Sequence, residues 1–263
     1  MKTEPITWGE CLIEEGQTRS FSCGDIVVEC RRAENEVILA SRAVDDEEPD
    51  QPGSDAPSRW TRWAVCTGGD SVSLLPRLPN LPLLVEPEDP FRITPGAEAR
   101  VFLRIPVSVA VNIQDPRSHE LTFFPTETLS QTWFGETDSG ELCYYLPSAV
   151  YRMPKEALDE AGVQAPVRIR NESNETLEVT RICLRVEGLA IHRKDARLWA
   201  NETVVRFQGG ENVSRIEVVA GPPPEAVGGE KIVSAPELKA REMVARTFRS
   251  LRKWTASLLD EGT

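Results

Sequence analysis

The amino-acid sequence predicts a mainly β protein, built from two antiparallel β-sandwich-like modules followed by a C-terminal amphipathic α-helix. Three observations support this fold class. Short runs of β-branched and aliphatic residues recur along the chain, turn-forming residues separate them, and helical periodicity is confined to the C-terminal end. Many short strands with regularly spaced turns are typical of sandwiches and barrels rather than of parallel α/β sheets.

Length and charge narrow the possibilities further. The chain has 263 residues, of which 40% are hydrophobic and 27% charged. This length suits one large domain or two small ones, and the composition is that of a globular protein, so we expect two modules. The net charge of -12 argues against a general nucleic-acid binder, because neutralising phosphates requires clustered Lys and Arg.

The first module is expected to span residues 1–115. Its strand-like runs, such as Asp25–Cys30 and Glu36–Ala43, are short and rich in β-branched residues. An acidic loop over 44–58 carries six carboxylates and no Lys or Arg. The carboxylates do not alternate around a glycine turn as a Ca²⁺ loop requires, so a solvated loop is predicted.

A Pro-rich connector is expected over residues 75–95. Leucine and proline each recur every three residues from Leu75 to Pro82, which is the period of a polyproline II helix. Such a segment can pack its leucines on the protein's own core or serve as a ligand for a partner, and core packing is favoured. In the following strand-like run, Ala99–Ile113, Pro106 predicts an edge or a bend.

The second module is expected to span residues 116–220. Between Leu129 and Pro147 a turn-forming ETDSG run is flanked by aromatic and aliphatic residues, which predicts a hairpin or a long loop. In Leu177–Val186 the apolar alternation slips by one at Arg181, which predicts a β-bulge.

The C-terminal end is read as a linker over 221–233 and an amphipathic helix over 234–260. Ser234 and Glu237 have the spacing of a capping box. From Ser234 to Leu259 six basic side chains face two acidic ones, a net charge of +4 that leaves -16 for the rest of the chain.

This helix carries the candidate partner-binding residues. Apolar residues recur at spacings of three and four, and basic residues lie between them; the chosen set is Val244, Phe248, Leu251, Arg241, Arg249 and Arg252. The helix is expected to dock on the acidic body of its own chain or on a second copy. A groove in a protein partner and an anionic membrane surface are the less favoured alternatives.

Catalysis, cofactors and metals have little support. With two histidines, His119 and His192, both expected at the surface, a catalytic triad or metal site has few ways to form. Cys23 and Cys30 are too far apart in sequence for a zinc site. Phosphate-binding loops, dinucleotide fingerprints and the nucleophile elbow are not found in the sequence. We therefore assign no catalytic, cofactor-binding or metal residues.

The sequence also bears on location. The N-terminal residues lack a basic start followed by an apolar run, and no apolar stretch reaches the roughly 18 residues of a membrane span. A cytoplasmic protein is expected, in which the six cysteines stay reduced.

Several short motifs together resemble an uncharacterised, mainly archaeal family that is known only as a domain of unknown function. They are Arg104–Val109, Trp133-Phe134-Gly135, Gly140–Tyr145, Pro166–Asn171 and Leu198-Trp199. The resemblance transfers no active site. Because genes of that family are often found near small mechanosensitive channels, it implies an accessory role at a membrane protein.

The predicted function is that of a non-enzymatic interaction or accessory protein. It would associate with itself through the C-terminal helix, or dock on a membrane protein such as a mechanosensitive channel; peripheral membrane contact is possible but not favoured. The alternative is an enzyme or small-ligand-binding protein with a pocket between the two modules. A flat apolar patch along Val244, Phe248 and Leu251 would favour the first function, and a deep pocket with convergent polar groups the second.

Overall fold

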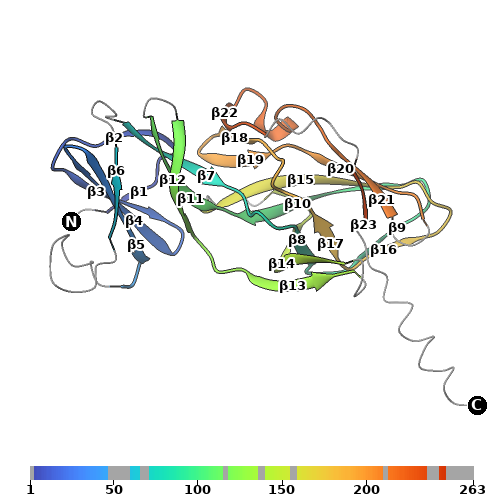
Figure 1. Ribbon diagram of the computed structural model, residues 1–263. Helices are drawn as coiled ribbons and strands as arrows, with labels where there is room; N and C mark the ends of the chain where they lie inside the picture. Colours follow the sequence, from blue (N-terminus) through green and yellow to red (C-terminus); the bar gives the residue numbers. More distant parts are fainter. Residues whose placement is uncertain are drawn as a thin grey trace, which may run out of the picture. The chain divides into compact units, whose positions relative to one another are not determined.

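The computed structural model describes residues 3–46, 60–65, 71–114, 118–135, 140–154, 159–209, 213–235 and 243–246, and they are mainly β (Figure 1). Within these residues the only helical element is a short 3-10 helix, η1 (Pro224–Ala226). The predicted mainly β class is therefore confirmed.

The chain divides into two compact units that are interleaved along the sequence. Unit 1 contains residues 1–78, 106–128 and 159–162, and unit 2 contains 79–105, 129–158 and 163–263. The module boundary expected after residue 115 falls inside a stretch that belongs to unit 1.

Unit 1 holds two sheets, with strand orders β1-β3-β4-β5-β6 and β12-β11-β7-β2. Two strand-like runs of the sequence are confirmed as β4 and β5, which are buried over at least half of their length and pair along eight residues. The strands are β1 (Thr3–Pro5), β2 (Gly9–Leu12), β3 (Thr18–Cys23), β4 (Ile26–Ala33), β5 (Glu36–Ala43), β6 (Thr61–Ala64), β7 (Ser71–Arg77), β11 (Ser108–Gln114) and β12 (Ser118–Pro125).

The turn between β3 and β4 is one place where glycine is required. Gly24 has φ +56, and a Cβ atom there would lie 2.8 Å from the Cβ of Ala161. Nearby, the Cys23 thiol donates to the carbonyl of Glu160 at 3.6 Å. The short stretch 159–162 therefore packs closely on this hairpin, although it is far from it in sequence.

The polyproline II prediction for residues 75–82 is wrong at its start, because Leu75, Pro76 and Arg77 belong to strand β7. Burial in β7 alternates with period two, so Val72, Leu74 and Pro76 are buried and the residues between them are partly exposed. Pro76 is tolerated because it lies beyond the stretch of β7 that pairs with β2. Pro106 ends β10 just before β11 begins, so the expected run Ala99–Ile113 is interrupted at this proline.

Unit 2 contains a 12-stranded sheet and the two-stranded sheet β9–β16 among the described residues. Its strands, apart from Pro106 and Gly162 at two strand ends, are β8 (Leu83–Pro87), β9 (Phe91–Ile93), β10 (Glu98–Pro106), β13 (Ser130–Phe134), β14 (Glu141–Tyr151), β15 (Gly162–Asn171), β16 (Leu177–Val179), β17 (Ile182–Leu184), β18 (Ile191–Lys194), β19 (Arg197–Ala200), β20 (Thr203–Phe207), β21 (Val213–Val218), β22 (Glu230–Val233) and β23 (Met243–Arg246).

The large sheet is built around β15. Strand β10 lies next to β15, and β19 and β20 pair one after the other with β15, both in parallel (Figure 1). β1–β3 and β8–β14 are parallel as well, so the prediction of antiparallel sheets is wrong for four strand pairs. These partners are not joined by tight turns, which is why local sequence signals did not indicate them.

Two predictions about connections in unit 2 had different outcomes. The predicted hairpin is confirmed as β13–β14, in which Trp133 pairs with Leu142. The β-bulge predicted at Arg181 is wrong, because the chain forms two separate strands there: β16 pairs with β9 and β17 with β8. Both alternatives break the apolar alternation, so the pattern alone did not distinguish them.

The C-terminal predictions are corrected where the structure describes the chain. The expected linker 221–233 contains η1 and strand β22, which pairs with β18. The expected helix 234–260 is wrong at Met243–Arg246, which form strand β23 antiparallel to β21. Pairing with the edge of a sheet outweighs the helical pattern there, because tertiary contacts override weak intrinsic propensity. The other residues of the expected helix, apart from Ser234 and Ala235, lie outside the described residues, as does most of the acidic loop.

Candidate functional site

Of the six predicted partner-binding residues, the structure describes the position of one. Val244 lies in β23, opposite Arg215 of β21. Val244 is therefore in a strand, and the helix face that was predicted to include it is not formed at this residue. Phe248, Leu251, Arg241, Arg249 and Arg252 lie outside the described residues.

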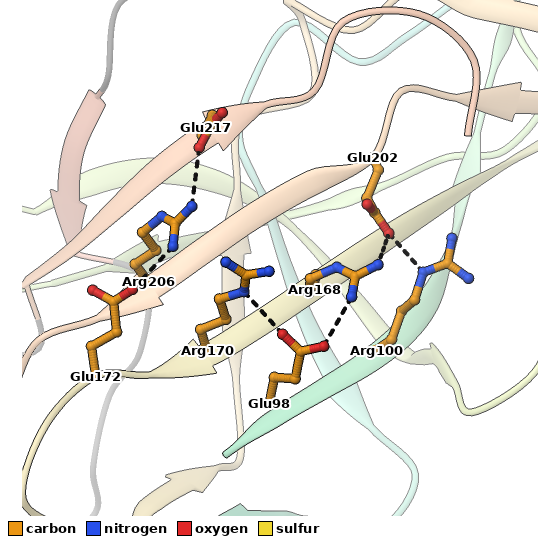
Figure 2. A network of polar contacts seen from close by, with 8 residues as sticks. All are labelled: Glu98, Arg100, Arg168, Arg170, Glu172, Glu202, Arg206 and Glu217. Atoms are coloured by element: carbon orange, nitrogen blue, oxygen red, sulfur yellow. Dashed lines mark hydrogen bonds and ion pairs between the residues drawn. The ribbon is translucent and has the colours of Figure 1, made fainter. Parts of the chain in front are cut away.

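A network of arginine and glutamate side chains crosses the same sheet near β21, and we call it the charged ladder (Figure 2). Its members lie on β10, β15, β20 and β21 and on the short segments after β15 and before β20. They are Glu98, Arg100, Arg168, Arg170, Glu172, Glu202, Arg206 and Glu217. Sequence reasoning missed this network, although the alternating charges in β10 and β15 were a visible signal.

The ladder is held together by shared contacts. Arg168 donates from Nη1 to Glu98 at 2.9 Å and from Nη2 to Glu202 at 3.3 Å. Arg170 also donates to Glu98, at 2.9 Å, so Glu98 lies between two guanidinium groups as Figure 2 shows. Burial is the largest single effect and acts to raise the pKa of Glu98, but the hydrogen bonds and charges of Arg168 and Arg170 together lower it. Arg168 and Glu98 are thereby each held by two neighbours.

Arg206, Glu172 and Glu217 form a second group of contacts within the ladder. Arg206 donates to Glu172 at 3.0 Å and to Glu217 at 3.5 Å, which raises the pKa of Arg206. The ladder's four arginines face four glutamates, so its formal charge is balanced. Exposed ion pairs contribute little to stability one at a time. The ladder therefore aligns β15, β20 and β21 and does not resemble a site for an anionic ligand.

Arg100 extends the ladder to η1. Its guanidinium donates from Nη1 and Nη2 to the two oxygens of Glu225, at 2.6 and 3.0 Å, and from Nε to Glu202 at 2.6 Å. The same guanidinium lies 4.9 Å from the centre of the Phe102 ring. Phe102 packs with Trp199 and with Ala226 of η1. Arg100 thus holds the chain that leads into β22 against the sheet.

The two histidines occupy different environments. His119 is exposed at the start of β12, as predicted. His192 was also expected at the surface, but it is only 4% exposed on β18, and its Nε2 has no hydrogen-bond partner within the described residues. Burial, with a smaller contribution from Lys231, lowers the pKa of His192. No group of three or more metal-binding side chains that includes His192 is found among the described residues.

The five described cysteines are buried free thiols. Burial raises the pKa of Cys23 to about 12 and also raises that of Cys30. The hydrogen bond between Cys143 and Cys183 raises the pKa of Cys183 and lowers that of Cys143. No group of three or more His, Cys, Asp or Glu side chains in the described part of the chain is placed to hold a metal ion.

Among the described residues, no helix has the length and apolar character needed to cross a bilayer.

Over the described residues the protein is mainly β, and a charge-balanced ladder of arginine and glutamate side chains crosses its large sheet. The chain belongs to the family described as Protein of unknown function (DUF432), whose model matches residues 7–252. No curated protein and no solved structure matches the chain.

Proposed function

We propose that this protein is a non-enzymatic interaction or accessory protein that associates with a protein partner through its C-terminal segment, residues 234–263. The observation that carries the proposal is the position of β23. This piece of the segment lies at an edge of the large sheet, where it pairs with β21 on one side and with no strand of the described residues on the other.

An edge strand is a natural place for a partner to bind. It presents unpaired backbone N–H and C=O groups, to which an extended chain can add as a further strand. β23 is also part of the basic stretch 234–259, whose net charge of +4 contrasts with -16 for the rest of the chain. The segment therefore combines an open backbone edge with a charge that attracts an acidic surface.

A second copy of the chain is the partner that the charge contrast supports best, because each copy supplies both a basic segment and an acidic body. The resemblance to a family encoded near small mechanosensitive channels supports a membrane protein as the other partner. Direct contact with an anionic membrane is less favoured, since the apolar helix face on which it depended is not formed at Val244.

The first experiment compares the full chain with a version that ends at Val233, by light scattering coupled to size exclusion at low and moderate salt. Association that is lost on truncation supports the proposal. If both forms are monomeric, self-association is ruled out. The other partner is then tested by comparing the binding of the full chain and of the truncated chain to a purified mechanosensitive channel. If both forms associate equally, the segment is not the interface and the proposal fails.

A matched pair of proline variants locates the contact more finely. Successive N–H groups of a strand point to opposite sides, so only one of Val244→Pro and Ala245→Pro removes a hydrogen bond to β21. The other removes a donor from the open edge. If the partner adds at that edge, the variant that removes the open-edge donor loses association, while its thermal stability stays near that of the parent chain.

A further inference from the structure

Cys143 and Cys183 bring two sulfur atoms to within 3.7 Å of each other in unit 2. Both side chains have 0% exposure, and they pack with Leu84 and Phe134 in one apolar cluster. Cys143 lies on β14 and Cys183 on β17. Strand β8 runs between these two strands and pairs with both.

A disulfide does not fit this arrangement. Neighbouring strands are about 4.8 Å apart, so two strands that flank a third are separated by roughly 9.5 Å. A disulfide bond requires Cα atoms within about 7 Å of each other and sulfur atoms about 2.05 Å apart. The cysteines could be joined directly only if β14 and β17 moved toward each other, and β8 prevents that movement.

A metal ion bound to both sulfur atoms can link Cys143 and Cys183 at a sulfur–sulfur distance that is too long for a disulfide bond. With metal–sulfur bonds of about 2.3 Å, two thiolates lie about 3.8 Å apart at a tetrahedral angle and about 4.6 Å apart when the three atoms are in line. The observed 3.7 Å is the hydrogen-bond contact of the two metal-free thiols. A two-coordinate ion lies in line between its ligands, and a shift of less than 1 Å brings the sulfurs from 3.7 Å to that separation.

We propose that Cys143 and Cys183 bind one soft, thiophilic metal ion of the Cu(I) class as a two-coordinate bis-thiolate. Thiolate ligands select soft ions, whereas Mg²⁺ and Ca²⁺ require oxygen ligands. Structural Zn²⁺ requires four ligands. No third metal-binding side chain joins the pair within the described residues, so a two-coordinate ion is the one that matches.

The binding step balances without a redox partner. Each thiol releases its proton to solvent, two metal–sulfur bonds form, and no electron is transferred. A monovalent ion with two thiolates carries a net charge of −1, which is costly to bury. Arg185 is close enough to interact electrostatically with both sulfurs, and its Nη1 has no hydrogen-bond partner in the described part of the chain. Glu141, the ion-pair partner of Arg185, offsets part of that compensation.

Ag(I) is the probe that tests the proposal, because it has the thiophilic character of Cu(I) and is stable in air. Since both thiols are fully buried, the ion is added to the full chain during refolding as well as to the native protein. After gel filtration against a competing thiol, the ratio of retained metal to protein is measured. The variants are Cys143→Ser and Cys183→Ala, with a control in which Cys11, Cys23, Cys30 and Cys66 are all replaced by Ala.

The parent chain and the four-alanine control are expected to retain one ion per chain, and each pair variant to lose at least tenfold in affinity. Retention by Cys143→Ser or Cys183→Ala at the parent level would overturn the proposal. So would a lack of retained Ag(I) in the refolded parent chain. Circular dichroism and thermal unfolding without metal establish that each variant is folded, and using two different substitutions leaves the test usable if one of them is not.

Discussion

Asn171 and Ser173 form a closed hydrogen-bonded pair at the end of β15. Asn171 Oδ1 accepts from the backbone N–H of Ser173 at 3.1 Å and from its hydroxyl at 2.7 Å. Its Nδ2 donates to the carbonyls of Ile93 and Glu175, at 2.8 and 2.7 Å. The amide is 1% exposed and ties the turn after β15 to β9.

Replacing Asn171 by Asp is expected to destabilise the protein by about 2–3 kcal/mol, because a carboxylate cannot donate to either carbonyl and adds a buried charge. Chemical denaturation measures the change in the free energy of unfolding. Asn174→Asp is the matched control, since Asn174 is exposed in the same turn. Equal losses for the two variants would show that the amide network has no special role.

Replacing Ala196 by Gly is expected to stabilise the protein by about 0.5–1 kcal/mol. Asp195 and Ala196, in the turn between β18 and β19, have φ of 51 and 60, a region in which Ala is strained and Gly is not. Ala43→Gly at the exposed end of β5 is the control, and it is expected to lower the melting temperature. A lower melting temperature for both variants would argue against strain at Ala196.

Stability is expected to fall as the pH decreases from about 7.5 to 5.5, because of His192. Its pKa is lower in the folded protein than the usual 6.5, so below pH 6.5 the unfolded chain binds a proton that the folded chain does not. The free energy of unfolding then decreases as the pH falls, by at most about 1.4 kcal/mol per pH unit. His192→Gln should flatten this dependence. Urea denaturation across this pH range measures it, and an unaltered slope in His192→Gln would contradict the assignment.

Arg100→Lys is expected to lower stability by about 1 kcal/mol, because lysine cannot form the two-point contact with Glu225 or stack on Phe102 in the same way. The expected loss of stability is small because about a quarter of each side chain of the Arg100–Glu225 pair is exposed to solvent, which weakens the ion pair. Arg92→Lys, in the more exposed pair with Glu178, is the control and should change stability very little. Thermal unfolding separates the two outcomes.

Local features of the fold were predictable from the sequence, and long-range ones were not. Strand β5 was predicted with its observed bounds, because a β-branched run between turn residues is a local signal. The parallel neighbours of β15 were missed, since β10, β19 and β20 come from distant parts of the chain. A helix was expected at Met243–Arg246 because the stripe of apolar residues carries no information about the edge of β21.

The same limit applies to the candidate sites. The basic C-terminal segment was recognisable from charge alone. The contact between Cys143 and Cys183 joins residues 40 positions apart, and it depends on β8 lying between their strands. The burial of His192 likewise depends on its pairing with strands on both sides, β19 and β22.

The interleaving of the two units limits how this protein can be divided or evolve. A fragment that begins at residue 116 would lack β8 and β10, so β14 and β15 would lose neighbours that the N-terminal half supplies. Neither unit can be transferred to another protein as one continuous stretch of sequence. During synthesis, β8 and β10 must also wait for later strands before the large sheet can close. Gene fusion is thus more readily accommodated at the ends of the chain than at its midpoint.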